Sequence, residues 1–349
     1  MPPATPTIRA LARQLGLSRT TVSEALRGLP RIKERTATRV RNAAALAGYR
    51  PNPLASAVMS QIRRSRSQAF RGGLAAVNLD ESDRPSYALR YHDALIEGAH
   101  DRAAELGYKL QTFLVGQEGV TVERLDSILQ SRGIQGLVLL PAWQEPDFSR
   151  LDWSRYAGVY TDYLIERPAL HAIASDHFRS LMGALQRLGE MGYRRAGMFL
   201  RRHHDERIQH RLEGAFLAYQ RSHRDAGRVP PLVMEEYNRA EFVRWFRRHK
   251  PDVVLGHRIE AVDWMKECGA KVPETAGFFS LNVTTESRPC AGLDLRPQLL
   301  GARSVELLIA QLQRNERGIP TPASLTMIPA LWCDGPTLTG RDRARRGAL

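Results

Sequence analysis

The sequence predicts an α/β protein: a small all-α domain at the N-terminus, then a core of two lobes, each a mostly parallel sheet with helices on both faces. Three observations support this prediction. The chain of 349 residues is too long for one ordinary domain. Its first segment is basic and has helical apolar periodicity, and from about Arg71 short apolar strands alternate with amphipathic helices.

Basic charge is concentrated at the N-terminus. The chain has a formal net charge of +14, and residues 1–66 hold 13 lysines and arginines but only two acids, Glu24 and Glu34. The remaining residues are close to neutral. A basic segment suits a polyanion such as nucleic acid, because each phosphate that it neutralises releases condensed counterions. A disordered basic arm or a solvated charged face would carry the same charge.

Apolar spacing argues for a folded domain in this segment. Thr7 and Ser18 are typical helix N-caps, Gly16 ends the first helix, and a third helix ends near Gly48. The positions expected to share one core are Ile8, Leu11, Ala12, Leu15, Val22, Ala25, Leu26, Val40, Ala43, Ala44 and Ala47. The tight link between the first two helices is what a helix-turn-helix requires, since it aims the second helix into the major groove.

Two neighbouring motifs resemble the lactose-repressor (LacI/GalR) family. The run TIRALARQLGLSRTTVS from Thr7 is similar to the family's headpiece, and AGYRPNPLA from Ala47 is similar to the start of its hinge. The resemblance implies a helix-turn-helix DNA-binding domain over 1–50, a hinge helix and linker over 51–70, a two-lobed periplasmic-binding-protein-like core over 71–340 and a basic tail over 341–349. Lobe one would comprise about 71–163 and 293–325, and lobe two about 164–292 and 326–340.

The resemblance also implies DNA contacts. Bases would be read by Arg19, Thr20 and Glu24, and the DNA backbone would be bound by Ser18, Thr21, Ser23, Arg27, Tyr49 and Asn52. Arg19 suits guanine, whereas a carboxylate can accept a hydrogen bond from cytosine N4. Glu24 stands where the family is often basic, and pairing with Arg27 or Arg31 without a base contact is an equal alternative. Lys33 replaces the usual hydroxyl and should weaken the cap of the third helix.

A hinge helix is expected after Asn52 and Pro53, an N-cap followed by proline at the first helical position. The apolar stretch that follows is too short to be a stable helix alone in water. In the resembled family this helix packs against a second copy on DNA and wedges into the central minor-groove step, here with Ala55 and Val58. Val58 stands where leucine is usual and Ser56 where arginine is common. A plain linker is the alternative.

Strand-length apolar runs alternate with helical patterns in the core. The runs are Leu74–Leu79, Gly136–Leu140, Gly197–Leu200 and Val253–Gly256, and the helical patterns are Leu89–Leu106, Val122–Ser131, His177–Met191 and Gln209–Arg221. This alternation predicts parallel sheets, whose ligands bind at the carboxyl ends of the strands. RLGEMGYRRAG from Arg187 is similar to a signature of the family's sensor core, and RLEGAF from Arg211 to the segment whose arginine holds the effector.

Effector-binding residues are implied at Asp162, Asp176, Arg211, His257 and Phe279. Here the sequence departs from the family: GHR from Gly256 replaces Ala-Asn-Asp, and GFFS from Gly277 replaces Gly-Phe-Asp-Asp. The loss of an Asn and an Asp would leave sugar hydroxyls unpaired. The effector could be a sugar or an anionic or aromatic metabolite, and the absence of a tight ligand is an alternative. Arg211 could instead pair on the surface with Glu206 or Glu213, and His257 could be a satisfied histidine at the cleft edge.

Enzyme and metal functions have little support in the sequence. It lacks a G-x-S-x-G elbow, a phosphate-binding G-x-x-x-x-G-K-S/T motif and a G-x-G-x-x-G after a strand. His203, His204 and His210 lack metal-site spacing, so a solvated or cleft-lining loop is favoured over a metal site. Three widely separated cysteines fit neither a disulfide framework nor a zinc site. No catalytic residue, cofactor or metal is expected.

The sequence therefore favours a transcription regulator, most simply a repressor of a catabolic operon, whose binding to double-stranded DNA a small molecule modulates. A homodimer on a pseudo-palindromic operator is expected, because one helix-turn-helix reads only a half-site. An activator or weakly ligand-responsive binder of the same family, a solute-binding transport protein and a nonspecific DNA binder are the alternatives. No apolar run approaches the ~20 residues that span a bilayer, and the N-terminus lacks the pattern of a secretory signal, which predicts a cytoplasmic protein without a membrane partner.

Overall fold

The computed structural model describes residues 8–26, 32–47, 72–116, 119–162, 167–223 and 227–340. The three N-terminal helices belong to one compact unit, and most of the chain from Gly72 onward forms a second. The predicted contacts at Arg27, Tyr49 and Asn52, the hinge residues Ala55 and Val58, and the basic tail lie outside the described residues. Within the part that the structure describes, no helix combines the length and apolarity needed to cross a membrane.

The N-terminal domain is a three-helix unit, as the apolar spacing predicts. Its helices are α1 (Ile8–Leu15), α2 (Arg19–Leu26) and α3 (Glu34–Leu46). They enclose one small core made of Leu11, Ala12, Val22, Ala25, Ala37, Val40 and Ala44. Gly16 ends α1 with a φ of +65°, a conformation that glycine adopts without steric cost. Ala47, predicted to face this core, is exposed, because the last buried position of α3 is Ala44, one turn earlier.

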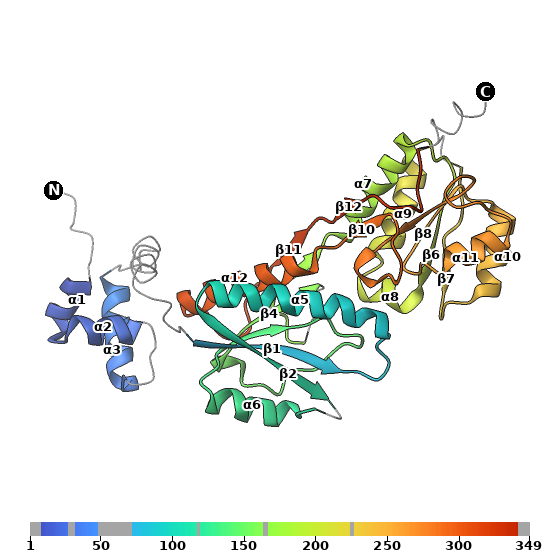
Figure 1. The fold of residues 1–349 in the computed structure, drawn as a ribbon. Helices are drawn as coiled ribbons and strands as arrows, with labels where there is room; N and C mark the ends of the chain where they lie inside the picture. Colours follow the sequence, from blue (N-terminus) through green and yellow to red (C-terminus); the bar gives the residue numbers. More distant parts are fainter. Residues whose placement is uncertain are drawn as a thin grey trace, which may run out of the picture. The chain divides into compact units, whose positions relative to one another are not determined.

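The first sheet of the core is parallel throughout, in the order β11-β5-β4-β3-β1-β2. Its strands are β1 (Gly72–Asp80), β2 (Tyr108–Gly116), β3 (Gly136–Leu139), β4 (Ala157–Asp162), β5 (His171–Ser175) and β11 (Leu325–Ile328). Helix α5 (Ser86–Glu105) and the start of α12 (Pro297–Arg314) lie along one face, and α6 (Val122–Ser131) covers the other (Figure 1). Fully buried strands such as β3 read as continuous apolar runs for this reason.

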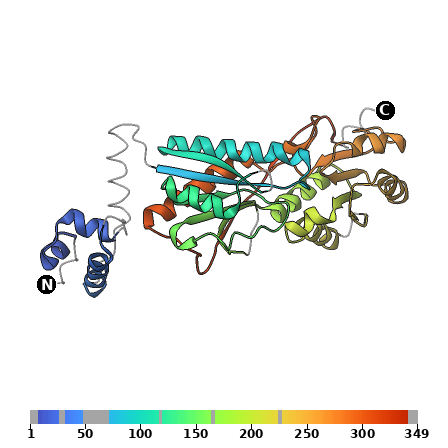
Figure 2. The ribbon, with the colours of Figure 1, turned by 90° about the horizontal axis from the view of Figure 1, so that it is seen from below.

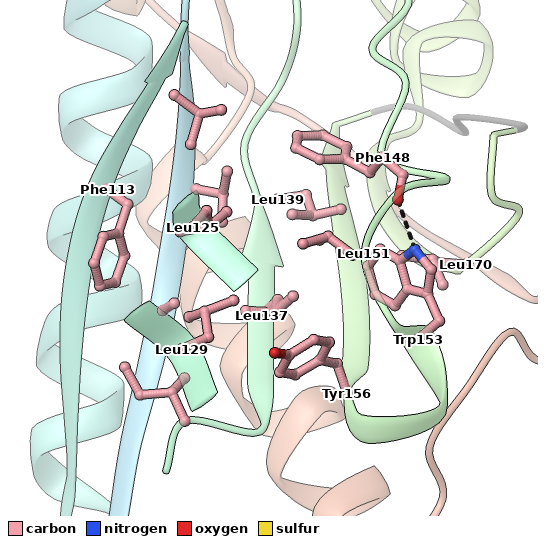
Figure 3. Close-up of a cluster of buried hydrophobic side chains, with 14 of the residues drawn as sticks. Phe113, Leu125, Leu129, Leu137, Leu139, Phe148, Leu151, Trp153, Tyr156 and Leu170 are labelled. Atoms are coloured by element: carbon pink, nitrogen blue, oxygen red, sulfur yellow. Dashed lines mark hydrogen bonds between the residues drawn. The ribbon is translucent and has the colours of Figure 1, made fainter. Parts of the chain in front are cut away.

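The face beneath α6 holds a large apolar cluster (Figure 3). Leu125 and Leu129 of α6 are fully buried against the strands. Two polar atoms within the cluster are satisfied locally: the indole nitrogen of Trp153 donates to the carbonyl oxygen of Phe148 at 2.9 Å, and the Tyr156 hydroxyl donates to the Asp126 carboxylate at 2.6 Å. Trp153 and Tyr156 therefore add buried apolar area while their own polar atoms stay hydrogen-bonded.

On the opposite face, α5 and α12 touch at two glycines. A Cβ on Gly98 would lie 2.0 Å from the backbone oxygen of Gln298, and a Cβ on Gly301 would lie 2.0 Å from the backbone oxygen of Leu95. No side chain fits at either position unless the helices separate.

The second sheet has the order β12-β10-β9-β8-β6-β7, with β12 antiparallel to β10 and the other pairs parallel. Its strands are β6 (Ala196–Arg201), β7 (Leu232–Met234), β8 (Val253–Gly256), β9 (Gly277–Ser280), β10 (Gly292–Asp294) and β12 (Leu331–Cys333). Its helices are α7 (His177–Glu190), α8 (Arg202–Arg207), α9 (Arg211–Ser222), α10 (Arg239–His249) and α11 (Ala261–Glu267), with short 3-10 turns η1 (Trp153–Arg155) in the first lobe and η2 (Val283–Thr285) in the second. Helices α7 and α9 pack together on one side, and α10 and α11 on the other (Figures 1 and 2).

The chain crosses between the two sheets at other points than the sequence predicts. Residues 164–175 were assigned to lobe two, yet β5 pairs with β4 in the first sheet. Residues 293–294 belong to β10 of the second sheet, and 326–328 belong to β11 of the first. Apolar content identifies a buried strand but not its sheet, because the pairing depends on neighbours distant in sequence.

Candidate functional site

The helix-turn-helix is formed by α1, the turn at Gly16, and α2. Ser18 caps α2: its hydroxyl oxygen accepts from the Thr21 backbone N–H at 3.0 Å and lies 2.8 Å from the Thr21 hydroxyl. The Arg39 guanidinium of α3 donates to the carbonyl oxygen of Leu15 at 2.8 Å, which satisfies one open group at the end of α1. These bonds cap the start of α2 and join α3 to the end of α1. A helix held in this way can enter the major groove.

Glu24 is buried, with 6% of the residue exposed, among the helices of the N-terminal domain. A residue that reads a base edge projects from the exposed side of the helix, so this burial does not favour the base contact predicted for Glu24. Its alternative partners, Arg27 and Arg31, lie outside the described residues. The side chains of Arg19, Thr20 and Ser23 are not described. Ser18 and Thr21 lie at the start of α2, where their hydroxyls contact each other at the helix cap.

In the core, Trp143 links the two lobes. It lies in the loop after β3 of the first sheet and is 4% exposed. The guanidinium carbons of Arg207 and Arg201, which come from the second lobe, lie 4.6 and 5.2 Å from the Trp143 ring centroid. His203 stacks edge-on at 5.0 Å, and its Nε2 lies 2.7 Å from the Trp143 carbonyl oxygen. We call Trp143, Arg201, His203, His204 and Arg207 the Trp143 cluster.

A buried carboxylate holds the loop that carries Trp143. Glu81, which directly follows β1, accepts from the backbone N–H groups of Trp143 at 2.7 Å and Gln144 at 2.8 Å. Arg84 donates to the same carboxylate at 2.6 Å and to Asn78 at 3.0 Å. The side chains of Glu81 and Arg84 are only 11% and 6% exposed. Such charge-assisted bonds fix the loop more firmly than neutral ones would.

Buried histidines lie beside this cluster. His257, at the end of β8, is 4% exposed, and its ring centroid lies 4.3 Å from that of His204. Burial lowers the pKa of His257 and of His92 to about 3 and lowers the pKa of His204 well below its usual value. Within the described ranges, His92 Nδ1, His204 Nδ1 and His257 Nε2 have no hydrogen-bond partner. Neutral imidazole nitrogens can donate or accept, so these three atoms are available to a polar ligand.

Arg258 makes a second connection between the lobes. Its guanidinium lies over the rings of Tyr87 from α5 and Tyr237, at 5.3 and 5.7 Å from the centroids, while Glu260 accepts two hydrogen bonds from it at 3.0 Å. Burial raises the pKa of both tyrosines, so both hydroxyls stay protonated near neutral pH. Close by, Arg90 of α5 donates to the carbonyl oxygen of Thr285.

Asp176 and Arg211 lie near one sheet edge. Asp176 caps α7, and its carboxylate accepts from the Arg179 N–H at 3.1 Å. Arg211 begins α9; its guanidinium contacts the Met327 sulfur at 3.6 Å and donates to Gln209 at 3.1 Å. Met327 pairs with Ala174, two residues before Asp176. In the described structure Arg211 therefore forms neither of the surface pairs with Glu206 or Glu213 considered from the sequence.

Phe279 is fully buried in β9, and its ring packs 4.6 Å from that of Trp332. This packing does not favour the effector contact predicted for Phe279, because the direction of a strand side chain depends on the face to which it points. Asp162 ends β4, as expected for a strand-end residue, but its side chain is not described.

Most of the polar contacts between the lobes were not predicted from the sequence. Glu81 and Trp143 follow β1 and β3, and Arg201 ends β6, so the rule that ligands bind at the carboxyl ends of strands applies to all three. His203 and His204, expected in a solvated or cleft-lining loop, lie instead on helix α8. The rule could have found the whole set only if the strand order had been known.

A helix-turn-helix domain and a core of two parallel-sheet lobes, with a polar and aromatic cluster between the lobes, define a class of DNA-binding proteins that carry a ligand-binding core. Residues 7–52 match the family model described as bacterial regulatory proteins, lacI family. The resemblance is therefore confirmed for the N-terminal segment, which carries a helix-turn-helix domain of the lacI type.

Curated relatives match parts of the chain. The HTH-type transcriptional regulator CelR of Thermobifida fusca is 24% identical over 193 residues, which cover 54% of each protein. The HTH-type transcriptional regulator GalS of Salmonella typhimurium is 32% identical over 145 residues, which cover 38% of this chain and 42% of GalS. The chain thus spans about half the length of the curated relatives it matches.

Solved structures confirm the predicted fold class over nearly the whole chain. The transcriptional regulator CelR in complex with cellobiose has a TM-score of 0.57 at 19% identity and covers 95% of this chain and 99% of its own. The lac repressor dimer bound to operator and the anti-inducer ONPF has a TM-score of 0.53 at 16% identity and covers 96% of this chain and 100% of its own.

Proposed function

We propose that this protein is a sequence-specific DNA-binding transcription regulator, whose affinity for its operator is set by a small molecule bound between the lobes of the core. The observation that carries the proposal is the LacI-family match of residues 7–52, which lies within the segment where the positive charge is concentrated. Charge supplies affinity for phosphates, and a rigidly capped α2 supplies the element that reads bases.

The protein acts as a homodimer on a pseudo-palindromic operator. One helix-turn-helix reads one half-site, and the solved lac repressor structure is a dimer bound to operator. Arg19 and Thr20 are the base-reading residues in this proposal, with Ala55 and Val58 of the hinge in the central minor groove. Repression by occupancy of the operator is the simplest outcome, and it takes place in the cytoplasm, where bacterial DNA lies.

The effector contacts the Trp143 cluster, together with His92 and His257. Trp143 offers an aromatic face, the arginines offer paired donors, and the histidine nitrogens offer donors or acceptors without a partner among the described residues. A metabolite with a sugar or other ring and an anionic group satisfies these requirements together. Cellobiose in the CelR complex supports a carbohydrate-like ring. Ligand contacts with both lobes would stabilise one arrangement of them, and this is how binding alters DNA affinity.

Selection of binding sites from a random DNA pool by the full-length protein tests the DNA-binding proposal. A palindromic consensus with a flexible central step is expected. The Arg19→Ala variant, compared in the same selection, should lose the base preference at one position of each half-site. Enrichment of no sequence at moderate salt would contradict specific recognition and leave a nonspecific DNA binder.

The effector proposal is tested with the selected operator. Sugars, sugar acids and sugar phosphates are screened for a change in operator affinity. The compound found is titrated against Trp143→Phe, at the proposed site, and Arg211→Ala, at the position where the family resemblance implies an effector contact. Both variants should bind operator normally and respond weakly. An unaltered response in both would place the effector elsewhere in the chain.

A further inference from the structure

We propose that Asp205, His210 and Glu213 form a binding site for a divalent transition-metal ion such as Zn²⁺ or Mn²⁺ at the start of α9. Each residue offers one ligand atom, and these three atoms lie within 4.8 Å of one another. Neither the family match nor the proposed regulation requires such a site, and the regulator proposal does not depend on it.

Asp205 supplies a buried and incompletely satisfied carboxylate. The residue is only 2% exposed, and one oxygen, Oδ1, accepts from the Leu212 backbone N–H at 3.1 Å. The other, Oδ2, is buried and accepts no hydrogen bond from any residue that the structure describes. It points toward His210, whose Nδ1 lies 3.5 Å away. A buried carboxylate oxygen without a donor is costly, and a bound cation would compensate that cost.

The distance between these two ligand atoms suits a metal ion. Bonds of about 2.0–2.1 Å from a tetrahedral ion to nitrogen and oxygen place neighbouring ligand atoms roughly 3.3 Å apart. The Asp205–His210 distance of 3.5 Å is already close to that value. The Glu213 carboxylate offers a third ligand atom within 4.8 Å of the other two.

The backbone turn before α9 brings Asp205, His210 and Glu213 close together. Gln209 and His210 adopt left-handed conformations, with φ of 58° and 54°, and the His210 N–H donates to the Asp205 carbonyl oxygen at 2.8 Å. This turn folds His210 back beside Asp205. His210 directly precedes α9 and Glu213 lies in its first turn, so the turn brings both side chains beside Asp205.

The donor set and the surrounding charges are compatible with a transition-metal ion. One imidazole and two carboxylates suit Zn²⁺ or Mn²⁺ better than Mg²⁺, which prefers oxygen ligands and keeps its waters. Three protein ligands leave room for a water molecule in a fourth position. The nearby Arg202 is ion-paired with Glu235, so it does not occupy the Glu213 carboxylate.

A metal at this position would clamp the start of α9 to α8. Arg211 lies between two of the three ligands in sequence, so metal occupancy would restrict the backbone that carries it. The Trp143 cluster takes His203, His204 and Arg207 from the same α8 helix. The site would therefore stiffen one wall of the proposed effector site without contributing a ligand to the effector.

The test uses the untagged full-length protein, stripped with a chelator and dialysed. Isothermal titration calorimetry with Zn²⁺, Mn²⁺ and Mg²⁺ is expected to show one site for the first two ions and none for Mg²⁺. His210→Ala and Glu213→Gln should weaken Zn²⁺ binding by at least roughly tenfold. Glu206→Gln, a neighbouring exposed acid outside the site, is the matched control and should bind as the unaltered protein does.

A second measurement separates binding from folding. Zn²⁺ should raise the Tm of the unaltered protein and of Glu206→Gln but not of His210→Ala, whose own Tm without metal should be nearly unchanged because the histidine side chain is exposed. Equal Zn²⁺ affinity in His210→Ala, Glu213→Gln and the unaltered chain would overturn the proposal, as would no binding by any of them. Because none of these measurements uses DNA, their outcome is independent of whether an operator is found.

Discussion

His203 in α8 lies with its Nε2 2.7 Å from the carbonyl oxygen of Trp143, in the loop after β3. This contact joins a helix of the second lobe to a loop of the first. It is reinforced by the stacking of Arg207 and Arg201 on the Trp143 ring. Second-lobe side chains contribute to the burial of Trp143. If the two lobes moved apart, the indole ring would therefore become exposed.

Trp143→Ala should destabilise the core by about 3 kcal/mol, the lower end of the cost of deleting a buried aromatic side chain. The Trp143 ring is buried and contacts both lobes. The variant therefore loses packing within the first lobe and the cation–π contacts with the second lobe. Urea denaturation of the full-length protein measures the change. Trp143→Phe keeps an aromatic face and should recover most of it. An equal decrease in the free energy of unfolding in both variants would show that an aromatic face at this position does not stabilise the core.

Glu81→Gln should destabilise the protein by about 3 kcal/mol, since it leaves the buried Arg84 guanidinium without its counter-charge. The amide retains one acceptor for the Trp143 and Gln144 N–H groups, so the loop stays in place but the ion pair is lost. The double variant Glu81→Gln/Arg84→Gln should cost less than the sum of the single changes. Strict additivity would show that the two side chains do not stabilise each other.

Acid should destabilise the core through its buried histidines. Burial holds the pKa of His257 at about 3, below the value near 6.5 of an unfolded chain. The unfolded state therefore takes up the proton first, so stability falls as the pH drops from about 6.5 toward 3. For one such histidine the loss between pH 7 and pH 5 is about 2 kcal/mol.

The comparison that isolates His257 is the slope of stability against pH. His257→Gln should show a shallower decline than the unaltered protein across this range. His100→Gln, a change at an exposed histidine, is the control and should leave the slope intact. A slope unchanged by His257→Gln would show that His257 takes up its proton as readily in the folded protein as in the unfolded chain.

The sequence predicted the N-terminal domain well because its information is local. Helix caps and apolar spacing set α1, α2 and α3, and the cap at Ser18 and the stop at Gly16 are confirmed. The missing cap at Lys33 is confirmed as well. The error at Ala47 arose because the helix no longer packs against its neighbours in the last turn, and spacing alone does not show where packing ends.

Prediction was weaker where distant segments meet. The strand runs of the core were recognised, but the assignment of β5, β10 and β11 to a sheet needs pairing partners more than a hundred residues away, as for β5 and β11. The Trp143 cluster could not be predicted for the same reason. Its polar and aromatic residues lie far apart in sequence, and only the strand order shows that they meet. The effector contacts that family position implies at Asp176, Arg211 and His257 stay predictions, and the burial of Phe279 does not favour a contact there.

Substitutions at Glu24 and Arg19 should have opposite effects. The change at Arg19 should alter the base preference, and the change at the buried Glu24 should alter the stability of the domain. Arg19→Ala should relax the preference at one operator position by roughly 1–3 kcal/mol, because a bidentate arginine–guanine contact is lost, while the domain stays folded. Glu24→Ala should lower the thermal stability of the domain, because a buried side chain with local interactions is deleted, and leave the base preference unchanged. Binding-site selection with both variants, read beside their thermal melting curves, separates the two roles. A changed base preference in a stable Glu24→Ala protein would show that this carboxylate turns outward on DNA, and an unchanged preference in Arg19→Ala would remove Arg19 from the base-reading residues.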